Sequence, residues 1–498
     1  MGAILARVTV PSQTPQTPQP STAPEPSTAP EPAPLRESTT DRLLHLLARE
    51  QVDRRLPSVV AGLVRDGRLV WWAARGSTSG PGEPPAAPAP TTRYRIGSIT
   101  KPLVATALMR AHDEGLFDLD DPVGRHLPEL GSDRADVGAL TVGQLLGQAS
   151  GLQAENDGAG PWWERTPGGD WAALAPALTA DARRHRPGTR FHYSNTGFAV
   201  LGELLARLRG RPWHEALQAD VLDPLGMDRA GFRRDEDSAA GLAVHPWADV
   251  VLPEPEHDAG AMAPAGQVWA SVPDMARFAA LLAGAPTAAG VLSDEARRLM
   301  TTPQAVDDPR GAGWGVGYGL GVQVWNLDGR RLVGHGGSMP GFIAALQVDV
   351  ASGDGVVAMT SSTTGFGDLP LRLLDTLADA EPRLPEPWSP SPVADDVLEL
   401  VGPWYWGPSP LVVRSEADGF LLEGLGRPGR SSRFRRSPAG DGTWVGLDAY
   451  YAGERLRVLR GADGRPSHLD LATFRLTRTP YDPAADVPGG VDEGGWRA

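Results

Sequence analysis

The chain has no cysteine among its 498 residues, and it has a single lysine beside 46 arginines. Without cysteine there are no disulfides, no thiolate metal sites and no cysteine nucleophile. No stretch approaches the run of about 18 apolar residues that a membrane-spanning helix needs. The net charge of −14 argues against nucleic acid as a partner. These absences predict a soluble globular protein that binds neither nucleic acid nor membrane.

The single lysine, Lys101, is a candidate for chemistry because of its rarity. Arginine and lysine serve equally well on a solvated surface, but a guanidinium stays charged where a buried ammonium can lose its proton near neutral pH. A lysine retained in a chain that otherwise uses arginine therefore suggests proton transfer. The alternative is a leftover surface residue, and composition alone does not separate the two.

Composition and pattern divide the chain into four segments. Residues 1–37 are proline-rich and contain STAPEP twice in tandem, which predicts a disordered arm. Residues 38–383 and 388–483 are expected to be folded domains, and the acidic, glycine-rich residues 484–498 a flexible tail. Arg7 interrupts the only apolar stretch of the N-terminal sequence, so we expect no secretory signal and a cytoplasmic protein.

The larger segment has strand patterns at both ends and helical patterns between them. SVVAGLV and LVWWAA, joined across Asp66-Gly67, predict a hairpin, and further strand patterns follow between residues 320 and 360. This order predicts an α/β (α+β) domain in which one antiparallel sheet is assembled from both ends and flanked by helices. Short strand patterns between glycine and aspartate turns predict that 388–483 is a small all-β barrel or sandwich.

The first motif is Ser98-Ile99-Thr100-Lys101, at the start of a predicted helix that continues to Glu114. Residues three apart share one helix face, so the Ser98 hydroxyl and the Lys101 amine can meet. A serine hydroxyl is a weak nucleophile without a base, and a desolvated lysine can be that base. The alternative is a helix-capping serine beside a surface lysine.

The second motif is Tyr193-Ser194-Asn195, before a helix predicted over 196–208. A phenol near a cation can be partly ionised and can exchange a proton with the serine or the leaving group. The Asn195 amide offers both a donor and an acceptor for a substrate amide. A helix-entry turn with a buried tyrosine is the alternative.

The third motif is His335-Gly336-Gly337-Ser338, between two strand patterns. Its glycines would let a ligand backbone approach a sheet edge closely. His335 would supply a donor or a positive charge to an anionic or carbonyl group of the substrate. Alternatively, the segment is only a turn or a bulge.

Together the three motifs, SxxK, YxN and HxG, resemble those of the serine β-lactamase-related group: class C β-lactamases, DD-peptidases and family VIII carboxylesterases. The stretches RIGSITKPLVATALMRAHDEGLFDLDDPV and LTVGQLLGQASGL add to the resemblance, which extends from about Thr40 to Ala380. It implies the β-lactamase/transpeptidase-like fold with a helical subdomain.

The resemblance also implies roles for the motif residues. Ser98 would be acylated, while Lys101 and Tyr193 would shuttle protons. Asn195 would orient the acyl side chain, and the backbone amides of Ser98 and Ser338 would form the oxyanion hole.

Two positions depart from the family pattern. Gln148-Ala149 stands where many relatives carry His-Thr, in a loop that lines their cleft, which affects the expected substrate range. Histidine at position 335, where lactamases prefer lysine, favours peptidase or esterase relatives.

The sequence therefore predicts a serine hydrolase that cleaves a small ester or amide, either a D-amino-acid peptide or a β-lactam-like compound, through an acyl-enzyme on Ser98. The alternatives are a catalytically silent penicillin-recognising module and a true β-lactamase. No cofactor and no metal are expected, because the histidines are scattered without ligand spacing. The β-rich tail resembles C-terminal modules of relatives, some of which cover the active-site mouth or mediate assembly, and this resemblance implies a homo-oligomer as one role for it.

Overall fold

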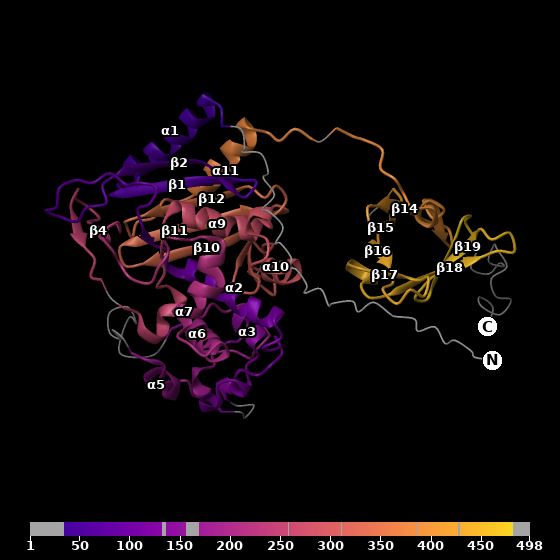
Figure 1. Ribbon diagram of the computed structural model, residues 1–498, viewed down its shortest axis with the longest axis horizontal. Coiled ribbons are helices and arrows are strands. Elements are labelled where there is room, and N and C mark those ends of the chain that lie inside the picture. The colour runs from indigo at the N-terminus through magenta and orange to yellow at the C-terminus, as the bar shows by residue number, and fades with distance from the viewer. Residues whose placement is uncertain are drawn as a thin grey trace, which may run out of the picture. The chain divides into compact units, whose positions relative to one another are not determined.

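The computed structural model describes most of the chain, in seven stretches: 34–131, 136–155, 169–256, 258–309, 311–385, 387–426 and 429–481. The chain separates into two compact units, Met1–Arg383 and Leu384–Ala498 (Figure 1). The predicted N-terminal arm lies outside the described residues up to position 33, and the predicted tail 484–498 lies outside them entirely.

An eight-stranded sheet forms the framework of the first unit, in the order β2-β1-β12-β11-β10-β9-β8-β7. Its strands are β1 (Ser58–Arg65), β2 (Arg68–Gly76), β7 (Ala305–Asp307), β8 (Val316–Tyr318), β9 (Gln323–Leu327), β10 (Arg330–Met339), β11 (Phe342–Asp349) and β12 (Gly355–Thr360). All pairings are antiparallel, and Val59 of β1 lies opposite Thr360 of β12. The sheet is therefore assembled from both ends of the unit, as predicted.

The hairpin between β1 and β2 turns at Asp66 and Gly67, whose φ angles are +53° and +70°. Positive φ at both central residues is typical of the type I′ turn, whose twist matches that of the strands. The predicted Asp66-Gly67 hairpin is confirmed.

Helices cover both faces of the sheet. The helices α1 (Glu37–Asp53) and α11 (Leu369–Ala380) lie on one face and α9 (Val272–Ala283) on the other (Figure 1). Alternate residues of β1 contact these two layers: Ala61 belongs to the core beneath α1 and α11, and Val60 to the core beneath α9. Because β1 is buried on both faces, its sequence is a continuous apolar run.

The helical part of the unit surrounds α2 (Thr100–Asp113), which is buried along most of its length. A helix that is apolar on all sides belongs in a core, and α2 contacts α6 (Asn195–Arg209) there. The other α-helices in the described part of this unit are α3 (Val142–Leu146), α5 (Trp171–Leu174), α7 (Trp213–Leu217), α8 (Asp223–Leu225) and α10 (Asp294–Thr301). Two short strand pairs complete it: β3 (Tyr94–Arg95) with β6 (Trp269–Ala270), and β4 (Leu242–Val244) with β5 (Val251–Pro253).

The second unit is a closed antiparallel barrel, which decides between the two predicted all-β forms. Its strands are β13 (Gly402–Trp406), β14 (Ser409–Glu416), β15 (Gly419–Gly424), β16 (Ser432–Arg436), β17 (Trp444–Gly446), β18 (Arg455–Arg460), β19 (Pro466–Leu471) and β20 (Phe474–Thr477), preceded by α12 (Asp395–Leu398). Trp404, Phe420 and Phe434 fill its interior. None of the helices in the described stretches of the chain combines the length and apolar character needed to cross a membrane.

Candidate active site

Ser98 lies in a 3₁₀ turn, Gly97–Ile99, that leads directly into α2. Gly97 has a φ of +55°, and a Cβ atom at this position would lie 2.5 Å from the backbone nitrogen of Ser338. Only glycine combines this backbone angle with so close an approach. The turn therefore holds Ser98, which is half-buried, against strand β10.

Lys101 follows in the first turn of α2, and it is 0% exposed. Its Nζ atom lies 2.9 Å from Ser98 Oγ and donates to the Ala265 carbonyl at 2.8 Å. Burial lowers the Lys101 pKa well below its usual range, and the negative charge of Glu155 opposes this effect in part. The position is buried next to a hydroxyl, so the surface-lysine alternative does not hold.

Tyr193 lies one residue before Ser194, the N-cap of α6, and its ring centre lies 4.9 Å from Lys101 Nζ. Burial raises the pKa of the Tyr193 phenol far above its usual range, while a hydrogen bond with Ser98 opposes the increase. The negative charge of Glu155 raises the pKa further. The expectation of a partly ionised phenol does not fit this structure, because desolvation is the largest effect on the Tyr193 pKa and favours the protonated form.

Asn195 is the first residue of α6, and its Nδ2 donates to Glu155 Oε1. Its Oδ1 atom is buried and has no hydrogen-bond partner within the described stretches. A buried acceptor without a partner costs free energy, and a substrate N–H can satisfy it. The helix-entry role is also present, since Ser194 caps α6 by accepting from the Gly197 amide at 2.9 Å.

The His335–Ser338 motif lies within β10, in the part that pairs with β11 but extends past the pairing with β9, which ends at Gly334. The expectation that it connects two separate strands is corrected, because β10 runs unbroken from Arg330 to Met339. Gly336 donates its backbone N–H to Gln323 Oε1 at 3.0 Å. A Cβ atom on Gly337 would lie 1.9 Å from the Ile96 carbonyl, so glycine is required there for the turn of Ser98 to pack on the strand. Ser338 is exposed.

His335 is buried, and both of its ring nitrogens are engaged. Nδ1 donates to the Gly336 carbonyl, and Nε2 lies 3.0 Å from the hydroxyl of Tyr318. Burial, together with the nearby Lys101 amine, lowers the His335 pKa to about 3. The predicted positive charge or donor to substrate is therefore wrong for this structure, because the ring is neutral and its N–H is used internally.

Three residues that contact or influence the site were missed, or only partly recognised, in the sequence. Tyr318 was not predicted, although it is fully buried against His335 and Tyr193. Glu155 was not predicted either, and its carboxylate acts on both Lys101 and Tyr193. Gln148 was noticed only as a departure from the family pattern. No motif spacing marks these residues, since each joins the site through tertiary contacts.

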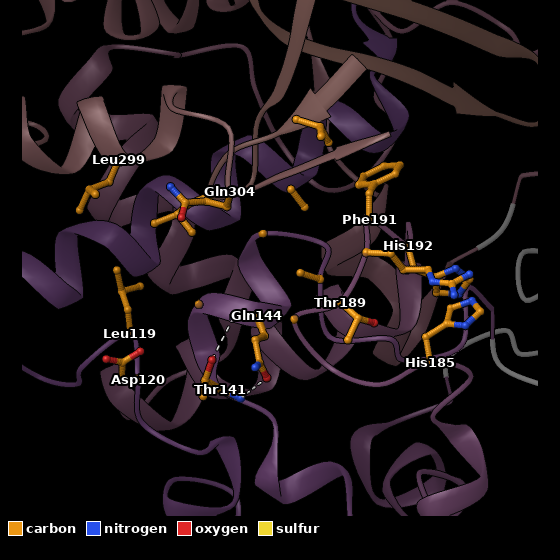
Figure 2. Close-up of a pocket in the computed structure, with 18 of the residues that line it drawn as sticks. Leu119, Asp120, Thr141, Gln144, His185, Thr189, Phe191, His192, Leu299 and Gln304 are labelled. Carbon is orange, nitrogen blue, oxygen red and sulfur yellow. Dashed lines mark hydrogen bonds between the residues drawn. The ribbon is translucent and has the colours of Figure 1, made fainter. Parts of the chain in front are cut away.

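A separate pocket of about 1220 Å³ is lined in part by residues 188–192, the segment just before Tyr193 (Figure 2). Figure 2 shows His185 and His192 on one side of this pocket and Leu119 and Leu299 on the other. Ser98, Lys101 and Tyr193 are not among its described lining residues, so the pocket is not the site of the three motifs. No group of three or more side chains suited to hold a metal ion occurs among the residues that the structure describes.

A family model described as Beta-lactamase matches residues 43–380. The chain belongs to this family. A second model, described as a domain of unknown function (DUF7586), matches residues 393–478 in the barrel unit. The family match and the fold agree with the β-lactamase-related resemblance of the sequence motifs.

Relatives within the family include a penicillin-binding protein and an esterase. Penicillin-binding protein 4 of Amycolatopsis lactamdurans is 30% identical over 328 residues, which cover 62% of this chain and 83% of the relative. Esterase EstB of Burkholderia gladioli is 31% identical over 300 residues, covering 53% of this chain and 75% of the relative.

Among solved structures, a D-stereospecific amidohydrolase from Streptomyces sp. is 26% identical with a TM-score of 0.55, covering 69% of this chain and 98% of that one. The octameric penicillin-binding protein homologue from Pyrococcus abyssi shares the fold, with a TM-score of 0.60 at 23% identity. This match covers 88% of this chain and 99% of that one. The family thus contains serine hydrolases of the β-lactamase type with esterase and amidohydrolase neighbours.

Proposed function

We propose that the protein is a serine hydrolase that cleaves a small ester or amide through an acyl-enzyme on Ser98. The observation that carries the proposal is the buried Lys101 amine 2.9 Å from the Ser98 hydroxyl. A desolvated amine that is neutral at working pH can accept the serine proton, which a permanently charged guanidinium cannot.

The opposite pKa directions of Lys101 and Tyr193 support a division of roles. A lowered lysine pKa favours the neutral amine, and a raised tyrosine pKa favours the protonated phenol. In the proposed acylation step, Lys101 accepts the Ser98 proton while Oγ bonds to the substrate carbonyl carbon. Tyr193 donates its proton to the leaving alkoxide or amine and recovers one from the Lys101 ammonium. The carbonyl–leaving-group bond breaks, and water later hydrolyses the serine ester.

The close packing of the Ser98 turn on β10 supports an oxyanion hole. The position of a Cβ on Gly97 would be only 2.5 Å from the Ser338 nitrogen, so the Ser98 and Ser338 backbones border the same space. Two backbone N–H groups aimed at one oxygen stabilise the charge that develops in the tetrahedral intermediate. We assign this role to the amides of Ser98 and Ser338, and the orientation of the acyl group to Asn195.

The charge states of His335 and Glu155 favour neutral or cationic substrates over β-lactams. His335 is neutral, so it offers no positive charge to the carboxylate of a lactam. The Glu155 carboxylate acts on both Lys101 and Tyr193, and it would repel an anionic substrate. A short-chain ester or a D-amino-acid amide fits these charges, in keeping with the esterase and the D-stereospecific amidohydrolase among the similar proteins.

A substrate screen tests the proposed function. Purified protein is assayed against short-chain p-nitrophenyl esters, D- and L-amino-acid amides and a chromogenic cephalosporin, with the Ser98→Ala variant as the blank. We expect turnover of an ester or a D-amino-acid amide that Ser98→Ala abolishes. Cephalosporin as the best substrate would indicate a β-lactamase, and covalent labelling without turnover would indicate a silent binding module.

The barrel unit is proposed to serve assembly or substrate access. One structural neighbour that covers most of the chain is described as octameric, which supports assembly of this protein as a homo-oligomer. Light scattering of the full chain and of a chain ending at Pro387 would test this role. A truncated protein with the same number of subunits and the same substrate range as the full chain would contradict this role.

A further inference from the structure

The residue that departs from the family pattern, Gln148, holds the chain on both sides of Tyr193. Its backbone carbonyl accepts from the His192 amide at 2.8 Å. Its side-chain Oε1 accepts from the Ser194 amide at 2.7 Å, and its Nε2 lies 3.4 Å from the Ser194 carbonyl. Three contacts from one residue therefore bracket Tyr193, the residue to which we assign proton donation.

The geometry of Gln148 itself is fixed by its surroundings. It is 1% exposed and adopts a φ of +53°, a left-handed conformation that non-glycine residues adopt only when the surrounding structure requires it. Its loop follows α3, which a capping box at Thr141 and Gln144 anchors. The backbone of Gln148 is thus fixed by its own loop, independently of its contacts with His192 and Ser194.

A buried polar chain continues from Gln148 to the opposite wall of the site. The Gln148 side chain hydrogen-bonds to Tyr318, whose hydroxyl lies 3.0 Å from His335 Nε2. The rings of Tyr318 and His335 pack on the Tyr193 ring with centroids 6.2 Å and 6.0 Å away. This series of buried polar side chains connects the loop after α3 to β10, and it passes directly beside Tyr193.

We propose that Gln148 is a positioning residue that fixes the Tyr193 hydroxyl against Ser98. Tyr318 and His335 support this position of Tyr193 by packing against its ring. The inference rests on the proposed function, because it requires that Tyr193 moves a proton. Gln148 lacks an acid–base group, and in this account it acts only through the placement of Tyr193. Misplacement of a reacting group by about 1 Å can cost on the order of a hundredfold in rate.

A double-mutant cycle with Tyr193 separates positioning from general support. Gln148→Met keeps the side-chain length and removes its hydrogen bonds. Alone, this variant is expected to lower kcat at least about tenfold while KM changes less than about twofold. In a Tyr193→Phe background the same change is expected to lower kcat less than about twofold, because the group being positioned is already absent.

Gln153→Met provides the matched control. Gln153 is a second buried glutamine in the same segment, but its side chain accepts from Arg184 at 3.2 Å rather than contacting Ser194. This variant should keep kcat within about twofold of wild type. If Gln148→Met does not fold by circular dichroism, Tyr318→Phe, which removes a single oxygen atom, replaces it in the cycle. Its expected loss in kcat is about threefold or more, again absent in the Tyr193→Phe background.

Equal losses from Gln148→Met in both backgrounds would overturn the inference, because they would show an effect that does not pass through Tyr193. Full activity of Gln148→Met would overturn it as well. Failure of the proposed function has a different signature, namely wild-type turnover by Ser98→Ala or Tyr193→Phe themselves.

Discussion

Lys101 Nζ lies 2.9 Å from Ser98 Oγ, and the lysine is withdrawn from solvent completely. The amine retains only two hydrogen-bond contacts among the described residues, the Ser98 hydroxyl and the Ala265 carbonyl. A charged ammonium in such a place costs far more free energy than a neutral amine. The site thus favours the form of lysine that can take up a proton.

Replacing Lys101 by arginine tests whether the residue moves protons. Lys101→Arg keeps a positive charge but cannot become neutral at working pH. We expect kcat on the best substrate to fall at least about a hundredfold, the scale of a positioned acid–base group. Circular dichroism and thermal melting control for folding. A folded variant with near wild-type kcat would show that Lys101 acts only through its charge.

The pH dependence of kcat/KM should respond to Glu155. The carboxylate of Glu155 raises the pKa of Lys101 against the larger lowering by burial. Activity that requires the neutral amine is lost as pH falls through the Lys101 pKa. Glu155→Gln removes the raising charge, so the acid limb of the profile should move to lower pH. An unchanged limb, or one displaced to higher pH, would exclude Lys101 as the group that titrates there.

The ionisation state of His335 can be observed directly by NMR. Its pKa of about 3 keeps the ring neutral throughout the physiological range. Long-range ¹H–¹⁵N spectra should show a neutral imidazole protonated on Nδ1, with shifts that do not change between pH 5 and 8. Titration of His335 between pH 5 and 8 would contradict its burial beside Lys101 and Tyr318.

Local sequence patterns were sufficient to predict contacts between residues that lie within one turn of each other. Ser98 and Lys101 are three residues apart at a helix start, so their proximity follows from helix geometry. The hairpin at Asp66-Gly67 likewise follows from turn chemistry. The position of Tyr193 beside them required the family resemblance, because nothing local fixes a contact across almost a hundred residues.

Burial accounts for the predictions that failed. The sequence does not reveal that Tyr193 and His335 are desolvated, and desolvation reverses the charge states that their neighbours alone would suggest. Tyr318 and Gln148 contribute through contacts between elements distant in sequence. Tyr318 belongs to no motif, and the quoted stretch that contains Gln148 does not show that its side chain contacts the Tyr193 segment.

Covalent labelling tests whether Ser98 is the nucleophile. Intact protein is treated with a fluorophosphonate probe, and its mass is measured before and after peptide mapping. We expect one adduct per chain, located on the peptide that contains Ser98, and no adduct on Ser98→Ala. An adduct on another residue, or undiminished labelling of Ser98→Ala, would contradict the role of Ser98 as nucleophile.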